Sequence, residues 1–277
     1  MPHARFGDVR RLETIDSTNR YLLAEARAGA PEGVVAVAEF QTAGRGRQGR
    51  RWTAPPGRNL LLSVLLRPRL GVHQRPLAAT VVALAARDAV RRVFGVDLGV
   101  KWPNDLVAQG GGKVAGVLAE TDVGEASVGS GRVDPPAVVV GIGVNCNWPD
   151  WADVADLEGG LARAVSLRMV TSRPIDREAL LLAFLDDLGP RVDELGGPVG
   201  RLRQLSELRT ACVTLGSPVR VELAERIVEG TATELTDEGH LVVRTNHGLE
   251  TVTTGDVIHL RAAPRRRPSE GSGGAQD

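Results

Sequence analysis

The residues best suited to chemistry form a glycine- and arginine-rich segment, GRGRQGRRW, at positions 44–52. Glycine lets backbone N–H groups approach an anion closely, and the arginine guanidinium binds phosphate oxygens in pairs. We therefore predict that residues 44–52 hold phosphate groups. The segment also matches G-x-G-x-x-G, but a dinucleotide fold requires a helix at the third glycine, and here prolines and another apolar run follow. The alternatives are a solvated basic loop and a single-stranded nucleic-acid site in which Trp52 stacks on a base.

A second segment, KWPND at positions 101–105, combines an ammonium, an amide and a carboxylate. Lysine neutralises phosphate charge, and aspartate binds Mg²⁺ or orients an incoming amine, so the segment is typical of a nucleotide–metal site. The alternative is a polar turn, because Pro-Asn-Asp favours turns. Lys101 and Lys113 are the only lysines among 34 basic residues. This usage indicates positions where a compact, movable charge serves better than a planar guanidinium.

The composition is that of a globular protein. The 277 residues are 42% hydrophobic and 25% charged, which supports a buried core, and the length predicts about two domains. Two cysteines without a C-x-x-C pair exclude a disulfide framework and predict a reducing, cytoplasmic setting. The formal net charge of zero disfavours a mainly electrostatic nucleic-acid binder. The sequence shows no signal peptide and no apolar run long enough for a membrane span.

Hydrophobic periodicity predicts the elements that must position these segments. Helices are predicted over 18–28, 75–93, 153–166, 175–188 and 198–209. Strands are predicted over 34–40, 60–66 and 137–144, together with a hairpin over 100–121 that turns at 110–112. The Gly/Arg segment therefore lies between two strands, and Lys113 lies near a hairpin turn.

The hydrophobic pattern changes near residue 212. From there, five short runs of alternating apolar and polar residues, separated by turns, predict a small barrel-like β unit. The last residues are polar and are expected to be disordered. We predict one domain over 1–210, a second over 211–262 and a disordered tail over 263–277.

Five stretches of the sequence, taken in order, resemble one family, the biotin–protein ligases. They are DSTN at 16–19, QTAGRGRQGRRW at 41–52, KWPND at 101–105, KVAGVLAE at 113–120 and GIGVN at 141–145. The β-rich C-terminus resembles the SH3-like domain of that family. The resemblance implies an α+β fold, in which a mixed β-sheet flanked by helices, as in class II synthetases and lipoate ligases, precedes a small C-terminal SH3-like β-barrel.

The resemblance also implies a two-step reaction. Biotin and MgATP give biotinyl-5′-adenylate and pyrophosphate, and a lysine of a biotin carboxyl carrier domain then displaces AMP. The acceptor would belong to an acetyl-CoA, acyl-CoA or pyruvate carboxylase. The resemblance further implies a cytoplasmic enzyme, a monomer or weak homodimer, with Mg²⁺ as cofactor and neither DNA nor a membrane as partner.

Residue roles follow from the resemblance by position. Catalytic roles fall to Lys113, Arg45 and Asp105, and Asp105 is also the expected Mg²⁺ ligand. The expected biotin-binding residues are Ser17, Thr18, Asn19, Gln41, Gly44, Arg45, Lys113 and Gly116. The expected nucleotide-binding residues are Arg45, Gly46, Arg47, Arg50, Trp52, Lys101, Asn104, Lys113 and Asn145. Lys113 would bridge the biotin carboxylate and the α-phosphate, where charge develops in the transition state.

The sequence departs from the family pattern at Gln48, where many members have a further basic residue. The first motif begins near residue 16, which leaves no room upstream for a helix-turn-helix domain, so operator-DNA binding is not expected. The alternatives are a lipoate–protein ligase, a nucleic-acid-binding module and a non-catalytic biotin sensor.

Overall fold

The fold is described from a computed structural model, which places residues 4–121, 136–148, 164–223, 225–253 and 255–260. The larger part of the chain forms a seven-stranded sheet in the order β1-β2-β3-β7-β6-β5-β4. Its strands are β1 (Val9–Ile15), β2 (Val35–Gln41), β3 (Leu60–Leu66), β4 (Gly99–Lys101), β5 (Asp105–Val107), β6 (Lys113–Thr121) and β7 (Val138–Val144). Only β1 and β2 pair in parallel among the described strands of this sheet, which is therefore mixed.

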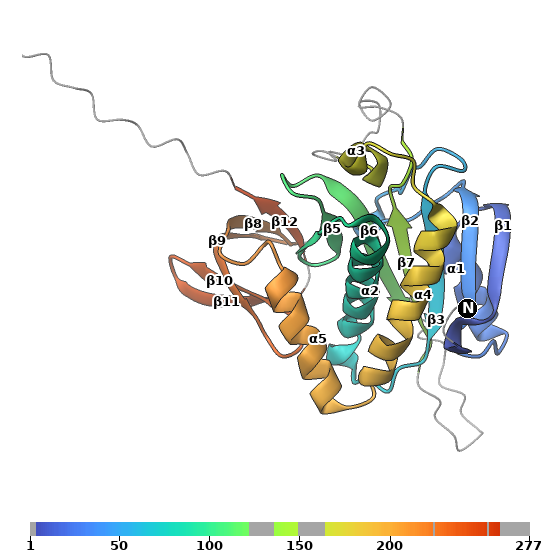
Figure 1. The fold of residues 1–277 in the computed structure, drawn as a ribbon. Coiled ribbons are helices and arrows are strands. Elements are labelled where there is room, and N and C mark those ends of the chain that lie inside the picture. The colour runs from blue at the N-terminus through green and yellow to red at the C-terminus, as the bar shows by residue number, and fades with distance from the viewer. Residues whose placement is uncertain (1–3, 122–135, 149–163, 224, 254, 261–277) are drawn as a thin grey trace, which may run out of the picture.

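Helices cover both faces of this sheet, as Figure 1 shows. The described helices are α1 (Thr18–Arg27), α2 (Pro76–Phe94), α3 (Leu167–Thr171), α4 (Arg177–Glu194) and α5 (Pro198–Ala211). Helix α1 covers one face, α2 and α4 cover the other, and α5 packs on α2 and α4. Short 3₁₀ turns occur at Ala4–Phe6, Arg47–Gly49 and Val72–Gln74. Successive side chains of a strand point to opposite faces. Accordingly, alternate residues of β2, β3 and β7 pack either with α2 and α4 or with α1.

The C-terminal part forms a separate five-stranded antiparallel sheet in the order β11-β10-β9-β8-β12. Its strands are β8 (Pro218–Glu222), β9 (Ile227–Leu235), β10 (Leu241–Thr245), β11 (Gly248–Val252) and β12 (Asp256–His259). This sheet follows α5 and lies beyond β4 and β5 (Figure 1). Val213 N donates to Val100 O at 2.9 Å and so links the second part of the chain to β4.

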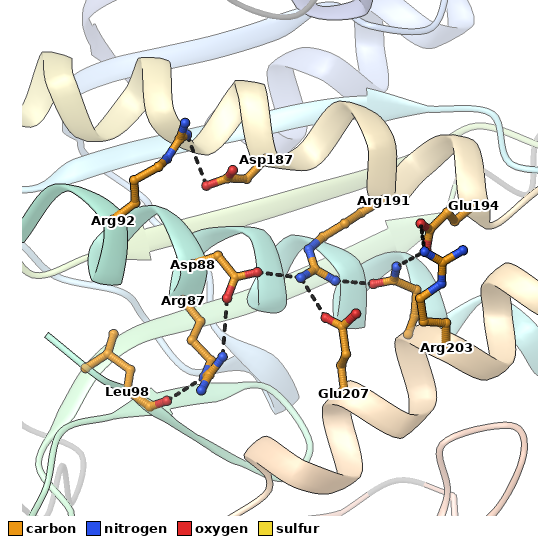
Figure 2. Close-up of polar contacts among 10 residues, drawn as sticks. Arg87, Asp88, Arg92, Leu98, Asp187, Arg191, Glu194, Arg203 and Glu207 are labelled. Atoms are coloured by element: carbon orange, nitrogen blue, oxygen red, sulfur yellow. Dashed lines mark hydrogen bonds and ion pairs between the residues drawn. The ribbon is translucent and has the colours of Figure 1, made fainter. Parts of the chain in front are cut away.

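A polar network holds α5 against α2 and α4 (Figure 2). The Arg191 guanidinium of α4, which is only 14% exposed, pairs with Asp88 of α2 and with Glu207 of α5. It also donates to Gln204 of α5. One partly buried cation therefore links three helices, and α5 leads directly into the second sheet.

The predicted mixed α+β fold and C-terminal β unit are confirmed by this arrangement. The domain boundary at 210 stays a prediction. The predicted end of a helix at residue 188 is wrong, because α4 continues through Pro190 to Glu194. Leu188 and Val192 are buried, so packing outweighs the hydrogen bond that proline removes.

Three further differences concern strands and one predicted helix. The sequence analysis missed β1, and the segment over 100–121 holds three strands rather than two. The helix predicted over 153–166 lies outside the described residues up to 163, and residues 164–166 are not helical. The predicted tail over 263–277 also lies outside the described residues.

Candidate active site

One cavity of about 620 Å³ gathers residues from several elements of the larger part of the chain and from β12. It is lined by the start of α1, the end of β2, the Gly/Arg loop, the β4–β5 turn, and β6 and β7. The sequence-predicted residues that line it are Ser17, Thr18, Asn19, Gln41, Arg45, Gly46, Arg47, Arg50, Trp52, Lys101, Asn104, Asp105, Lys113, Gly116 and Asn145. Gly44 does not line it. Gly44 is required behind the loop, where an added Cβ would lie 2.4 Å from Trp52 O.

A neutral polar cluster occupies one end of the cavity, at the start of α1. Thr18 N and Oγ1 donate to Gln41 Oε1 at 2.8 and 3.1 Å. Ser63 Oγ lies 2.7 Å from Thr18 Oγ1 and 2.6 Å from Asn19 Oδ1. Ser17 caps α1 by accepting from Arg20 N. These short side chains present amide and hydroxyl groups that match N–H and C=O groups of a ligand.

Ser63 was missed by the sequence analysis, although a signal was present. It is the one polar residue in the apolar strand LLLSVLL, and it is fully buried. A buried hydroxyl requires hydrogen-bond partners. Here those partners are the predicted site residues Thr18 and Asn19.

Glycines of β6 and β7 form the floor of the cavity. A Cβ at Gly143 would lie 2.5 Å from Trp52 Cε2, and a Cβ at Gly141 would lie 2.3 Å from Asn19 Oδ1. Gly116 leaves room in the same way for Trp52 and Lys113. The Trp52 Nε1–H is buried without a hydrogen-bond partner in the described part of the chain. A ligand acceptor would satisfy this donor.

A charged cluster occupies the opposite end. Lys113 Nζ lies 2.8 Å from Asp105 Oδ1 and 5.4 Å from the centroid of the Trp52 ring. Burial lowers the pKa of Lys101, and the neighbouring Lys113 charge acts in the same direction. Asn104 is fixed by its Nδ2, which donates to Val117 O at 2.8 Å. Two ammonium groups and one carboxylate thus converge on the space next to the polar cluster.

The Gly/Arg loop is tied to the second sheet. Arg47 NH1 donates to Asn104 Oδ1 at 3.3 Å and to Gly255 O at 3.2 Å. Arg50 forms an ion pair with Asp256 of β12, and Asp256 also lines the cavity. Burial lowers the pKa of Arg47. The sequence carried no signal for Asp256, which lies more than 200 residues beyond the loop.

Asn145 is 1% exposed, and its amide is bonded to the protein. Its Nδ2 donates to Lys113 O at 3.2 Å and to Val165 O at 3.3 Å, while its Oδ1 accepts from Asn59 Nδ2. In this arrangement Asn145 positions the main chain at Lys113. Its predicted contact with the nucleotide stays a prediction.

The described residues contain no cluster of three or more His, Cys, Asp or Glu side chains arranged for a metal ion. Any cation in the cavity would therefore depend on ligand oxygens in addition to Asp105. Within the same described ranges, no helix has the length and apolar character that a bilayer span requires.

Comparisons with known proteins match both parts of the chain. The family model described as "Biotin/lipoate A/B protein ligase family" matches residues 12–145. The model described as "Biotin protein ligase C terminal domain" matches residues 214–260.

Individual relatives agree with these matches. The biotin–[acetyl-CoA-carboxylase] ligase of Mycobacterium tuberculosis is 35% identical, covering 88% of this chain and 86% of the relative. The bifunctional ligase/repressor BirA of Bacillus subtilis is 29% identical over 88% of this chain and 72% of the relative. The solved structure of a biotin protein ligase from Aquifex aeolicus with biotin and ATP has a TM-score of 0.74 and 26% identity. It covers 93% of this chain and 100% of that structure's chain.

Proposed function

The chain belongs to the biotin/lipoate A/B protein ligase family, and on that premise we propose that it is a biotin–protein ligase. It activates biotin with ATP to biotinyl-5′-adenylate and transfers the biotinyl group to a lysine of a biotin-carrier protein. The observation that carries this proposal is the single cavity that joins a neutral polar cluster to a cationic cluster. The first suits the ureido ring of biotin, and the second suits a carboxylate meeting a triphosphate.

In the first step, a biotin carboxylate oxygen bonds to the α-phosphorus of ATP, and pyrophosphate leaves with the electrons of the broken P–O bond. Negative charge concentrates on the α-phosphate oxygens in the transition state. Lys113 points into the cavity next to Trp52, so we place its ammonium at that charge. A cation held in advance at this point stabilises the transition state without reorganisation.

The phosphates of ATP are assigned to the loop and the β4–β5 turn. Arg47, Arg50, Lys101 and Asn104 all line the cavity, and Arg47 NH1 donates to Asn104 Oδ1 at 3.3 Å. Arg50 exchanges the Asp256 carboxylate for phosphate oxygens when the nucleotide binds. Arginine suits this exchange because its planar fork accepts either anion in pairs of hydrogen bonds.

In the second step, the acceptor lysine attacks the acyl carbon, the bond between that carbon and the phosphate oxygen breaks, and AMP leaves. Asp105 orients the attacking amine. Its carboxylate lies 2.8 Å from Lys113, so the groups that serve both steps are adjacent. The amine then approaches the same point at which the adenylate was formed.

Mg²⁺ accompanies ATP in this proposal. Asp105 lines the cavity, and its Oδ1 is held 2.8 Å from the Lys113 ammonium. Two carboxylates line the cavity, those of Asp105 and Asp256, and Asp105 fits Mg²⁺, which is commonly held by one or two carboxylates together with substrate phosphates. When bound, the ion supplies charge neutralisation to the triphosphate.

The acceptor is proposed to be the biotin carboxyl carrier domain of an acetyl-CoA carboxylase, or of an acyl-CoA or pyruvate carboxylase. The first choice is supported by the name of the Mycobacterium tuberculosis relative. We further propose a monomer or weak homodimer in the cytoplasm. Both cysteines, Cys146 and Cys212, are free and buried thiols, which suits a reducing compartment.

The test is ATP–pyrophosphate exchange with purified protein and Mg²⁺, using biotin and lipoate in parallel. Exchange that depends on biotin is the expected result. Exchange with lipoate alone would show that lipoate, and not biotin, is the substrate. No exchange with either acid would overturn the proposal. Transfer is tested separately, by following the mass increase of a purified carrier domain and of its variant without the acceptor lysine.

A further inference from the structure

Glu120, near the end of β6, joins the two halves of the cavity although it does not line it. Its Oε2 accepts from Asn19 Nδ2 at 2.8 Å, and its Oε1 lies 2.8 Å from Arg45 NH1. The carboxylate is 20% exposed. Resting on the proposed function, we infer that Glu120 is a positioning residue that fixes Asn19 for the biotin ring and ties it to the Gly/Arg loop.

The orientation of the Asn19 amide is fixed by its own hydrogen bonds. Its Nδ2 donates to Glu120 and to Leu118 O at 3.2 Å. Both N–H bonds are therefore used by acceptors of β6, and Oδ1 must face the other way, toward Ser63 Oγ. Glu120 thus fixes Asn19 with its oxygen as an acceptor at the polar end of the cavity.

The polar cluster has too few hydroxyl protons to satisfy every oxygen in it. Ser63 Oγ lies within hydrogen-bond distance of both Thr18 Oγ1 and Asn19 Oδ1. A hydroxyl carries one proton and can donate to only one of these oxygens. The cluster therefore retains acceptor capacity for an N–H group of a ligand. The ureido ring of biotin supplies such N–H groups.

Glu120 also holds the Gly/Arg loop, through Arg45. Arg45 is 47% exposed and belongs to the segment that bears the phosphate-binding arginines. It is held by the second oxygen of a carboxylate whose first oxygen is already bound to Asn19. A ligand that orders Asn19 also orders Glu120, and with it the anchor of Arg45. Binding of the ring is thereby coupled to the position of the loop.

A merely structural ion pair would behave differently. A partly exposed pair contributes little to stability, so its loss would leave biotin recognition unchanged. If Glu120 positions Asn19, loss of Glu120 should instead weaken the binding of biotin selectively. The KM for biotin should rise more than the KM for ATP, which is affected only through the Arg45 anchor of the loop, and the melting temperature should remain near that of the parent protein.

The experiment compares E120A and E120Q with E178Q. Glu178 is the matched control, because it pairs with Arg11 at 2.6 Å outside the cavity. In ATP–pyrophosphate exchange, E120A should raise the KM for biotin about tenfold, as expected when a hydrogen bond to a charged, partly buried group is removed. E120Q keeps an acceptor for Asn19 but loses the charge that faces Arg45, so its increase should be smaller. E178Q should match the parent protein.

A biotin analogue in which a ring N–H is replaced by oxygen provides the second readout. The parent protein should bind this analogue more weakly than biotin, and the difference should shrink in E120A because Asn19 is no longer held as an acceptor. An unchanged biotin KM with an unchanged difference would overturn the inference, as would equal increases in the KM for biotin and for ATP. If the parent protein shows no biotin-dependent exchange, the proposed function fails, and calorimetric biotin binding to the same variants still tests Glu120.

Discussion

Replacement of Lys113 by alanine separates a catalytic role from a structural one. In the folded protein the ammonium contacts Asp105 at 2.8 Å and lies 5.4 Å from the Trp52 ring centroid. Both partners of the ion pair are about one-fifth exposed. A partly exposed pair and a cation–π contact contribute about 1 kcal/mol to stability. The melting temperature of a chain of this size should therefore fall by only about 2–4 °C.

The catalytic effect should be much larger. Lys113 is placed at the oxygens on which charge develops, and loss of one preorganised donor at such a position lowers the rate about 10²- to 10³-fold. This range corresponds to about 2.7–4 kcal/mol of transition-state stabilisation. The free energy lost from the transition state thus exceeds that lost from folding by about threefold.

The assay is single-turnover formation of biotinyl-5′-adenylate, with biotin affinity measured by calorimetry and folding followed by thermal unfolding. Lys113→Ala should lose adenylate formation while it retains biotin binding, and Lys113→Arg should recover part of the rate because it keeps the charge. Equal losses in biotin affinity and adenylate formation would refute the reasoning. They would mean that Lys113 stabilises the bound substrate and the transition state equally, rather than the transition state alone.

Three further predictions concern packing, stability and pH. Gly143→Ala should displace the Trp52 indole, since the new Cβ would lie 2.5 Å from it. It should lower exchange activity at least tenfold, as expected for misplaced site groups, whereas Gly71→Ala, whose new Cβ would meet only Gln74 Oε1 at an ordinary 3.9 Å, should not. Arg191→Met removes the cation that joins three helices and should lower the free energy of unfolding by about 1–3 kcal/mol, because two ion pairs with partly exposed carboxylates and a charged hydrogen bond to the buried Gln204 are lost. Urea unfolding measures this loss, and a change below 1 kcal/mol would contradict it. Because burial lowers the pKa of Lys101, binding of ATP should weaken as pH rises through a value below the usual 10.4 of lysine. Lys101→Arg should move this alkaline limb to higher pH, and an identical limb in the two proteins would exclude Lys101 as its source.

Local patterns sufficed for much of the fold and for the chemistry of the site. The apolar runs of β2, β3 and β7 and the cap at Ser17 are properties of neighbouring residues, so their elements matched the predicted ranges closely. The residue types of the Gly/Arg loop and of the two lysines were enough to predict an anion site. Their roles are still predictions, but the side chains given individual roles from the sequence, Arg45, Arg47, Arg50, Lys101 and Lys113, all line the cavity. Arg51 belongs to the predicted phosphate-binding segment without a role of its own, and it lines the cavity too.

Other features required the folded chain, because they depend on partners far away in sequence. β1 carries charged residues and has no buried face of its own, so it is recognisable as a strand only through its parallel pairing with β2. Pro190 would end an isolated helix, yet the packing of α4 against α2 carries the helix past it.

The same reason applies to Glu120 and Asp256. Glu120 ends the KVAGVLAE stretch that resembles the family, and Asp256 stands in a turn, yet charge alone does not reveal what faces either carboxylate. The fold sets Glu120 between Asn19 and Arg45, and it brings Asp256 against Arg50 across the two sheets. Residue type therefore indicated which chemistry the chain can perform. The distances between oppositely charged groups arise only when strands from both ends of the chain are packed together, and these distances decide which groups act on one another.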